Sequence, residues 1–251
     1  MAARTVLVTG GAKRLGAAIV RRLAGEGWRV AIHCNRSSDE AAALAGEVGG
    51  VVVQADLADM NGAAPLIAVA REALSGPVGA LVNSASAFEY DRPPALDPAL
   101  FARLAAINAG TPAALACALA AQGDLAAGWV VNLLDQKLAN LNPDFFSYTC
   151  AKAALASATT MLAQALGPRI TVNAVAPGLT LPSADQSEAE FAAVASQNLL
   201  ERPVGADAVA DAVAFLLGAR GVTGQTVFVD AGQRFVARTS DVMFDRDRPR
   251  G

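Results

Sequence analysis

The sequence is poor in cysteine, histidine and charged residues, and each shortage argues against a class of protein. Its three cysteines, Cys34, Cys117 and Cys150, are odd in number and scattered, without a C-x-x-C pair, and His33 is the single histidine. This pattern argues against a disulfide framework and against a zinc site. We therefore expect neither a disulfide nor a bound metal.

Charged residues make up only 17% of the 251 residues and hydrophobic residues 53%, which is not the composition of a disordered chain. The net charge of −3 provides no basic field for a polyanion, so we expect no nucleic-acid partner. The longest apolar run, residues 113–121, is far shorter than the roughly 20 residues that span a bilayer. No signal-like core precedes the Thr9-Gly10 pair. We expect a cytoplasmic protein without a membrane segment.

Short apolar runs that are typical of strands alternate with alanine- and leucine-rich helical stretches along the chain. The first run ends in a glycine pair, and Leu15, Ile19 and Leu23 then recur at helical spacing. Continuously apolar strands are buried on both faces, as in a parallel sheet covered by helices. The pattern predicts one α/β domain over residues 1–237, with a doubly wound, mainly parallel seven-stranded sheet and about six helices, and a charged tail at 238–251. The predicted strands are residues 4–8, 29–33, 51–54, 80–83, 129–133, 170–175 and 226–229.

A glycine-rich segment, Thr9-Gly10-Gly11-Ala12-Lys13-Arg14-Leu15-Gly16, joins the first predicted strand to the first helix. Glycines there let the backbone approach a diphosphate, and the amides of the helix N-terminus point at its negative charge. A simple glycine turn is the alternative, but the position at the first strand of a repeating β/α chain favours a nucleotide. The pattern predicts a Rossmann-type cofactor site that includes Gly10, Lys13, Arg14, Leu15 and Gly16.

The end of the second predicted strand indicates which dinucleotide this is. Sites that prefer NAD usually place an acid there for the ribose 2′-hydroxyl, but this strand is followed by Asn35, Arg36 and Ser37. Arg36, Ser37 and Lys13 offer cationic and hydroxyl donors suited to a 2′-phosphate. A helix is expected to start near Ser37, and its N-terminus would add to the site. NADP(H) is therefore favoured, the alternative being that Arg36 is only a solvated loop charge. We expect His33 to be structural rather than catalytic.

Tyr148 and Lys152 form the most informative pair. Four residues apart on a helical stretch, they project from the same face and can meet at one site, near Asp135. An ammonium beside a phenol favours the phenolate, so we expect the pKa of Tyr148 to lie below its usual range, which makes it a proton donor for hydride-transfer reduction. The alternative for such a spacing in isolation is an ordinary pair on a helix surface.

Over essentially its whole length the sequence resembles the short-chain dehydrogenase/reductase family. The motifs that carry the resemblance occur in the family's order: the glycine segment, Asp56, Asn83-Ser84-Ala85, Asn108, Tyr148-x-x-x-Lys152 and Pro177-Gly178. The resemblance implies an NADP-binding oxidoreductase and a homotetramer, with the tail around residues 238–248 lying against a neighbouring subunit.

The same resemblance implies roles for individual residues. Asp56 would contact adenine, Asn83 would stabilise the central sheet and the cofactor pocket, and Asn108 would hold a water in a proton relay to Lys152. Lys152 would also bind the nicotinamide ribose. The further cofactor contacts implied are Leu57, Ser84, Ala85, Tyr148, Pro177 and Gly178, with Pro177-Gly178-Leu179-Thr180 beside the nicotinamide.

Three departures from the general family pattern narrow the resemblance. Arg14 stands where the family usually has a glycine, Ser86 replaces the glycine after Asn83-x-Ala85, and Asp135 replaces the serine thirteen residues before the tyrosine. With the His33-x-x-Arg36-Ser37 segment and Phe88, these residues are similar to the pteridine reductase branch, which includes bacterial dihydromonapterin and dihydrofolate reductases of short-chain type.

A pterin is a flat ring with amide and amino edges, so an aromatic side chain can stack on it while polar groups bind its edges. Phe88 is the candidate platform, unless it is a core residue. Asp135 can pass or orient a proton toward a ring nitrogen, unless it is merely a loop acid. The candidate substrate residues are Arg14, Ser86, Phe88, Asp135 and Tyr148, and the candidate catalytic residues are Asp135, Tyr148, Lys152 and Asn108. Specificity is expected in residues 179–203.

The leading hypothesis is an NADPH-dependent reductase that moves hydride to a C=N bond of a pteridine. The enzyme alternative is a carbonyl or 3-ketoacyl reductase, whose usual serine is missing here. A non-catalytic NADP(H)-sensing regulator is the alternative of another class, and it predicts loss of Tyr148 or Lys152, both of which are present.

Overall fold

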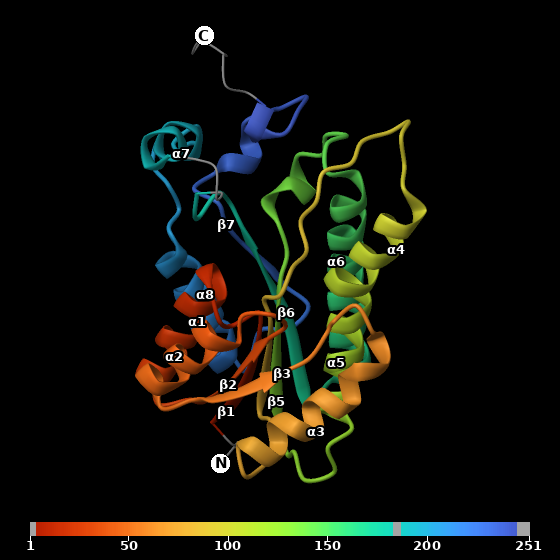
Figure 1. Cartoon of the computed structure of the whole chain (residues 1–251), viewed down its shortest axis with the longest axis vertical. Coiled ribbons are helices and arrows are strands. Elements are labelled where there is room, and N and C mark those ends of the chain that lie inside the picture. Colours follow the sequence, from red (N-terminus) through yellow and green to blue (C-terminus); the bar gives the residue numbers. More distant parts are fainter. Residues whose placement is uncertain (1–3, 183–186, 245–251) are drawn as a thin grey trace.

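The computed structural model describes residues 4–182 and 187–244, which form a sheet covered by helices on both faces (Figure 1). The seven strands are all parallel, in the order β3-β2-β1-β4-β5-β6-β7, which confirms the predicted doubly wound sheet. Three strands have the predicted boundaries, and the boundaries of the other four differ by one or two residues. The strands are β1 (Thr5–Thr9), β2 (Arg29–Cys34), β3 (Val51–Gln54), β4 (Ala80–Asn83), β5 (Gly128–Leu133), β6 (Ile170–Pro177) and β7 (Thr226–Val229).

The helices divide between the two faces of the sheet. In Figure 1, α1 (Arg14–Gly25), α2 (Ser38–Val48) and α8 (Ala206–Gly218) cover one face, and α3 (Ala63–Ala73), α4 (Pro98–Ala105), α5 (Thr111–Ala120) and α6 (Phe146–Leu166) cover the other. Alternate residues of β1 enter separate cores, because successive strand side chains point to opposite faces. Val6 and Val8 pack with α1 and α8, whereas Leu7 packs with α3 and α5. With α7 (Glu188–Ala195), the described residues form eight α-helices, two more than predicted.

The order of the strands fixes where a ligand can bind. From β1 the chain winds outward to β2 and β3, and then returns to the other side of β1 with β4. Loops at the carboxyl ends of β1 and β4 therefore diverge and leave a crevice, as in other open parallel sheets. The glycine segment and Asn83-Ser84-Ala85 both lie at this crevice.

Helices α4 and α5 belong to one helical stretch, Pro98–Ala120, interrupted by a π turn at Ala106–Gly110. This stretch is long and apolar enough to cross a membrane, a property that it shares with core helices of globular domains. In this fold it packs against α3 and α6 instead. The π turn directs the Asn108 side chain inward, where it is fully buried.

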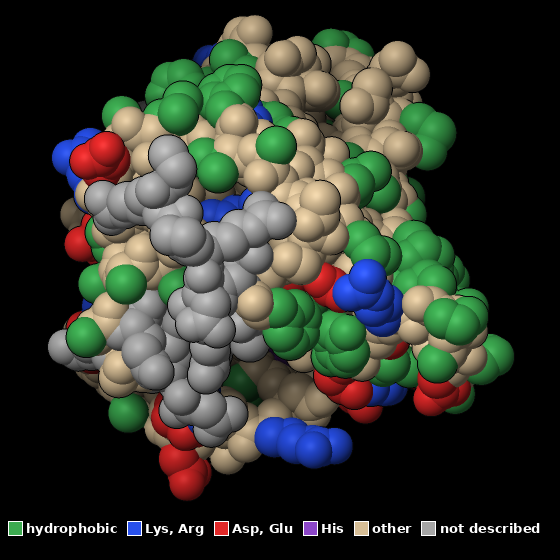
Figure 2. Space-filling model, turned by 90° about the horizontal axis from the view of Figure 1, so that it is seen from above, with side chains coloured by type: hydrophobic (Ala, Val, Ile, Leu, Met, Phe, Trp, Pro, Cys, Tyr) green, Lys and Arg blue, Asp and Glu red, His purple; other side chains and the backbone are tan. Residues whose placement is uncertain are grey.

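The start of the charged tail packs on its own domain. Val242 is buried, and the backbone N–H of Asp241 donates to Oδ2 of Asp144 at 2.8 Å. Figure 2 shows this end of the molecule from above, where acidic and basic side chains lie beside hydrophobic ones. Residues 238–244 are thus continuous with the domain that was predicted to end at residue 237. Contact of the tail with a neighbouring subunit stays a prediction, and residues 245–248 lie outside the described residues.

Candidate active site

The glycine segment forms a tight turn between β1 and α1. Gly10 has a φ of +62°, and a Cβ on it would lie 2.8 Å from the Cα of Ala85. A Cβ on Gly16 would lie 2.1 Å from the carbonyl oxygen of Gly10. Any side chain at these two positions would force the loop apart, so the backbone packing here requires glycine.

Arg14 also lies in the left-handed region, with a φ of 52°, where a glycine would be unstrained. Its side chain lines both the large groove at the crevice and a smaller cavity beside Asp135. Nη2 lies 3.5 Å from the Leu181 carbonyl oxygen. The departure from glycine thus adds a cation that lines both spaces.

The groove at the crevice has a volume of about 630 Å³. Most of the predicted cofactor residues line it, whereas Ser37, Asn83, Tyr148, Lys152, Pro177 and Gly178 do not. Ser86, predicted to bind substrate, lines this groove rather than the smaller cavity. The predicted residues along it are Gly10, Lys13, Arg14, Leu15, Gly16, Arg36, Asp56, Leu57, Ser84 and Ala85.

The end of the groove near β2 carries the residues predicted to select the cofactor. Arg36 is exposed along the groove wall. Lys13 instead pairs with Glu40 of α2, with Nζ 2.6 Å from Oε1, a contact that the sequence analysis missed. Ser37 occupies the N-cap position of α2, although its side chain makes no capping hydrogen bond. Of the three predicted 2′-phosphate donors, Arg36 is therefore the one placed along the groove without an ion pair to another described residue.

His33 ties the glycine loop to the end of β3. Its Nδ1 lies 3.1 Å from the backbone nitrogen of Gly10, and its Nε2 lies 3.2 Å from the carbonyl oxygen of Ala55. Since the amide donates and the carbonyl accepts, the ring must be neutral, with its proton on Nε2. Burial lowers the pKa of His33, which favours this neutral form. The residue thus has the structural role that was expected.

Asn83 holds strands together beneath the groove. Its Nδ2 donates to Oδ1 of Asn132 on β5 at 2.8 Å, and Asn132 in turn donates to Thr159 of α6. Only 2% of Asn83 is exposed. This bridge between β4, β5 and α6 agrees with the stabilising role that the family resemblance implied.

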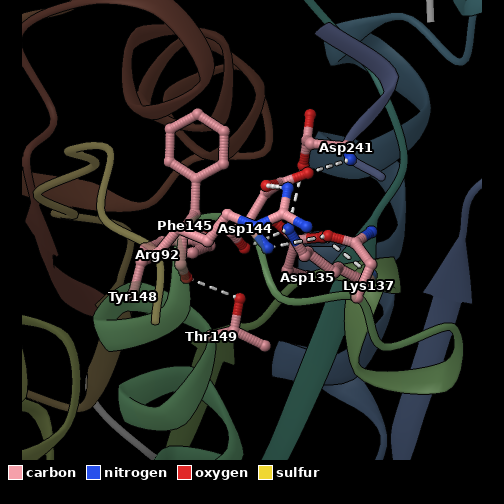
Figure 3. Close-up of polar contacts among 9 residues, drawn as sticks. Arg92, Asp135, Lys137, Asp144, Phe145, Tyr148, Thr149 and Asp241 are labelled. Atoms are coloured by element: carbon pink, nitrogen blue, oxygen red, sulfur yellow. Dashed lines mark hydrogen bonds and ion pairs between the residues drawn. The ribbon is translucent and has the colours of Figure 1, made fainter. Parts of the chain in front are cut away.

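Asp135, Tyr148 and Lys152 meet beyond the carboxyl end of β5. The Tyr148 hydroxyl donates to Oδ2 of Asp135 at 2.8 Å, and Oδ1 of Asp135 accepts from the backbone N–H of Lys137, also at 2.8 Å. Lys152 Nζ donates to the Leu133 carbonyl oxygen at 2.7 Å and lies 5.7 Å from the centre of the Tyr148 ring. The carboxylate of Asp91 accepts from the Ser147 backbone N–H and thereby caps the start of α6. Figure 3 shows Asp135 and Tyr148 among their neighbours.

The expected pKa of Tyr148 was wrong in direction. Burial and the neighbouring Asp135 carboxylate raise the pKa of Tyr148 well above its usual range, because both disfavour a phenolate. Burial also raises the pKa of Asp135 and lowers that of Lys152 to about 8. The expectation followed from the Lys152 ammonium, and it took into account neither the depth of burial nor the effect of the Asp135 carboxylate on the phenol. Tyr148 therefore keeps its proton near neutral pH.

Asn108 is committed to the loop that follows β4. Its Oδ1 accepts from Ser86 Oγ at 2.8 Å and from the backbone N–H of Ala87 at 3.1 Å, and its Nδ2 donates to the Ala87 carbonyl oxygen at 2.9 Å. The side chain thus positions the segment leading to Phe88. A water relay from Asn108 to Lys152 stays a prediction.

Phe88 lies at the surface and not in the core, and its role as a platform for the substrate stays a prediction. Its side chain is 47% exposed and stacks on Phe145, with ring centres 4.1 Å apart and planes at 18°. It also meets the Tyr148 ring edge-on at 4.7 Å. Phe88 lines the smaller cavity of about 220 Å³, which Asp135, Arg14 and Gly178 also line. Four predicted site residues are therefore brought together around one space.

A charged network on the rim of this cavity was not foreseen. Lys137 is buried, and its Nζ donates to the Asp144 carbonyl oxygen at 2.6 Å and lies 3.0 Å from Oδ2 of Asp241 (Figure 3). Arg92 donates to the buried Asp144 carboxylate at 2.8 Å. Asp241 and Val242 line the cavity from the tail. No sequence signal pairs residues that lie about 100 positions apart.

Known proteins resemble this chain over nearly its whole length. A family model described as enoyl-(acyl carrier protein) reductase matches residues 10–234. The chloroplastic NADPH-dependent aldehyde reductase 2 of Arabidopsis thaliana is 31% identical, over 92% of this chain and 94% of that protein. The dihydromonapterin reductase of Shigella sonnei is 28% identical, over 91% of this chain and 95% of that enzyme. FolM alternative dihydrofolate reductase 1 from Brucella canis, solved with NADP, has a TM-score of 0.88 and 45% identity, over 94% of this chain and 96% of that chain.

Proposed function

The chain belongs to the short-chain dehydrogenase/reductase family, and from this premise we propose that it is an NADPH-dependent reductase of pteridines. It transfers hydride to a C=N bond of a dihydropterin or a dihydrofolate-type substrate. One observation carries the proposal: an aspartate, Asp135, hydrogen-bonds the Tyr148 hydroxyl at 2.8 Å, at the position where the general family pattern has a serine. The similarity to a dihydromonapterin reductase and to an alternative dihydrofolate reductase supports it.

The groove fits the proposed cofactor. Gly10 and Gly16 have no room for a Cβ, so the loop backbone packs closely at the N-terminus of α1, where a diphosphate would bind. Arg36 provides a cation for a 2′-phosphate, and no acid follows β2 at the place where NAD-preferring sites have one. NADPH, when bound, supplies the hydride.

Phe88 and Asp135, which line the smaller cavity, and Tyr148 and Lys152 behind them divide the remaining work. Phe88, backed by Phe145, stacks the flat ring of the substrate. Tyr148 gives its proton to the ring nitrogen as the neighbouring carbon receives hydride, and its raised pKa keeps that proton available. Asp135 orients the Tyr148 hydroxyl by accepting its hydrogen bond. The Lys152 ammonium supplies positive charge next to the Tyr148 ring.

The two alternatives fit the site less well. A carbonyl or 3-ketoacyl reductase needs a neutral donor to polarise a ketone oxygen, whereas a carboxylate at Asp135 would repel that oxygen. A non-catalytic NADP(H) sensor has no need of the assembled trio of Asp135, Tyr148 and Lys152.

Consumption of NADPH tests the proposal. The purified protein should oxidise NADPH, measured by its absorbance, when given a 7,8-dihydropterin, and should do so much more slowly with simple ketones. NADH should be a poor substitute. Brisk ketone reduction without turnover of dihydropterins would contradict the pteridine assignment and leave only the assignment as a short-chain reductase.

Assembly and location are part of the same proposal. We propose a homotetramer in the cytoplasm. Its support is the hydrophobic content of 53% and the presence of exposed apolar side chains on helices, such as Met161 on α6 and Phe215 on α8. The three cysteines are unpaired, which suits a reducing compartment. Sedimentation tests the assembly, and a stable monomer would refute it.

A further inference from the structure

The smaller cavity has a polar wall that the proposed chemistry does not use. Gln136, in the 3₁₀ turn directly after Asp135, lines the cavity. Its Oε1 is buried and accepts no hydrogen bond from any described residue. A buried acceptor without a donor is destabilising, and groups of this kind in folded proteins usually have a partner. An unpaired acceptor on a residue that lines a ligand cavity therefore points to a donor on the ligand.

A second acceptor on the same cavity comes from the tail. The Asp241 carboxylate lines the cavity, and its side chain is 13% exposed. Its position is fixed from two sides, because Lys137 Nζ lies 3.0 Å from Oδ2 and the Asp241 backbone N–H donates to Asp144. The backbone of Lys137 also holds Asp135. Lys137 thus holds Asp241 in place as well as Asp135 of the proposed proton-donor pair, and it directly follows Gln136 in the chain.

We propose that Gln136 and Asp241 form an acceptor subsite that recognises hydrogen-bond donors on the substrate and so determines specificity. The inference rests on the proposed pteridine reductase activity and deepens it. A pteridine has two sources of such donors: the amino group and ring N–H of its pyrimidinone edge, and the hydroxyl groups of a polyol substituent. An amide oxygen and a carboxylate both match this chemistry, since each accepts without donating through these atoms.

The size of the cavity and the charge at its Asp241 end support a small occupant without an anionic group at that end. At about 220 Å³ it is smaller than the roughly 300 to 1,000 Å³ of most ligand pockets, so it has room for a bicyclic ring and little more. An anionic substituent placed against Asp241 would meet a like charge. Lys137 offers it little compensation, because its ammonium already contacts Asp144 and Asp241.

A pair of substitutions at Gln136 tests the subsite. Gln136→Met removes the acceptor at nearly the same length, and Gln136→Glu keeps an acceptor there. In Gln136→Met, KM for a 7,8-dihydropterin should rise about tenfold, with kcat and the NADPH dissociation constant within about twofold of the parent. Gln136→Glu should retain most of the affinity. Gln225→Met is the matched control, because Gln225 is exposed next to β7, away from the cavity.

Substrate analogues identify the donor. One arm compares a 2-amino dihydropterin with its 2-oxo analogue, and the other compares a 6-trihydroxypropyl dihydropterin with the 6-methyl compound. For the analogue that lacks the recognised donor, KM in Gln136→Met should be nearly the same as in the parent, instead of tenfold higher. Asp241→Asn should reduce the difference in KM between the two compounds of the pair in which the recognised donor is present or absent.

The outcomes distinguish a failure of the proposed function from a failure of the acceptor subsite. Absence of dihydropterin turnover by the parent protein would contradict the proposed function itself. Normal turnover by the parent, with Gln136→Met and Asp241→Asn unchanged in KM toward all four compounds, would overturn only the acceptor subsite. A rise in KM that is equal for all compounds would also overturn it, because that result describes a general loss of packing.

Discussion

The cofactor groove and the substrate cavity adjoin each other, yet they are built differently. The groove is built around the turn after β1, where Gly10 and Gly16 leave no room for side chains, and residues after β2, β3 and β4 complete its lining. The cavity is formed by side chains from the glycine loop, the segment after β4, the turn after β5, α7 and the tail. Arg14 is the residue that lines both. We therefore expect single polar substitutions to have larger and more selective effects in the cavity than along the groove.

The largest effect is expected at the proton donor. Tyr148→Phe should lower kcat for pteridine reduction by roughly 100- to 10,000-fold, because it removes the general acid, while NADPH binding by fluorescence titration stays nearly intact. Tyr90→Phe is the matched control, since Tyr90 is the only other tyrosine and its hydroxyl makes no hydrogen bond with a described residue. Equal losses in the two variants would contradict the role of Tyr148.

Asp135 distinguishes the pteridine site from a ketone site. Asp135→Ala should lower turnover of a dihydropterin by about 100-fold, with little change in cofactor affinity, because the Tyr148 hydroxyl loses its acceptor. Asp135→Ser should gain some ketone reduction. Steady-state kinetics with both substrate classes measure the change, and full dihydropterin activity in Asp135→Ala would exclude the assigned role.

On the groove side, Arg36→Asp should erode the preference for NADPH over NADH. A charged hydrogen bond to a 2′-phosphate contributes roughly 1.5 to 3 kcal/mol, so the ratio of dissociation constants should fall about 10- to 100-fold. Glu40→Gln serves as a comparison, because it releases Lys13 from its ion pair without altering Arg36. Equal affinity for the two cofactors in the parent protein would refute the NADP assignment.

The pH profile tests the ammonium beneath Tyr148. Burial lowers the pKa of Lys152 to about 8, so the ammonium is present below that pH and is lost as the pH rises through it. In the free enzyme, kcat/KM should fall about tenfold per pH unit above this pKa. Lys152→Arg, whose side chain stays charged, should lack this alkaline limb even if its overall rate is low. A flat profile to pH 10 in the parent would count against the ammonium.

The smallest effect is expected at the aromatic platform. Phe88→Ala should weaken pteridine binding through loss of ring stacking, by about 0.5 to 1.5 kcal/mol beyond the buried area, or about two- to tenfold in KM. Phe88→Tyr should retain the affinity. Unchanged KM in Phe88→Ala would place the ring of the substrate elsewhere in the cavity.

The contrast between the two regions also explains what the sequence could predict. The glycine turn of the groove depends on local order, because Gly10 and Gly16 lie in one segment after one strand. The pair of Tyr148 and Lys152, which does not line the groove, is also local, because the two residues are one helical turn apart. The parallel sheet follows from the same short-range patterns. Residues that act through neighbours in sequence were therefore predictable.

The cavity wall depends on tertiary contacts, and these have no local pattern. Asp241 reaches Lys137 across 104 positions, and Lys13 turns to Glu40 of α2. The pKa of Tyr148 was expected to fall because the sequence displays Lys152, but burial and Asp135 raise it. Gln136 carried no signal at all, since an unpaired acceptor is recognised only when its surroundings are known.

His33 gives the protein a spectroscopic reporter of its own. Because it is the single histidine, its two ring nitrogens produce one pair of signals in a ¹⁵N spectrum, and no assignment is needed. The chemical shifts of the pair distinguish the Nε2-protonated tautomer from the other neutral form and from the cation. Nδ1 accepts from Gly10, so any displacement of the glycine loop when a dinucleotide arrives would register there directly. Cofactor loading can thus be followed in the unmodified chain, at an atom one hydrogen bond from the loop.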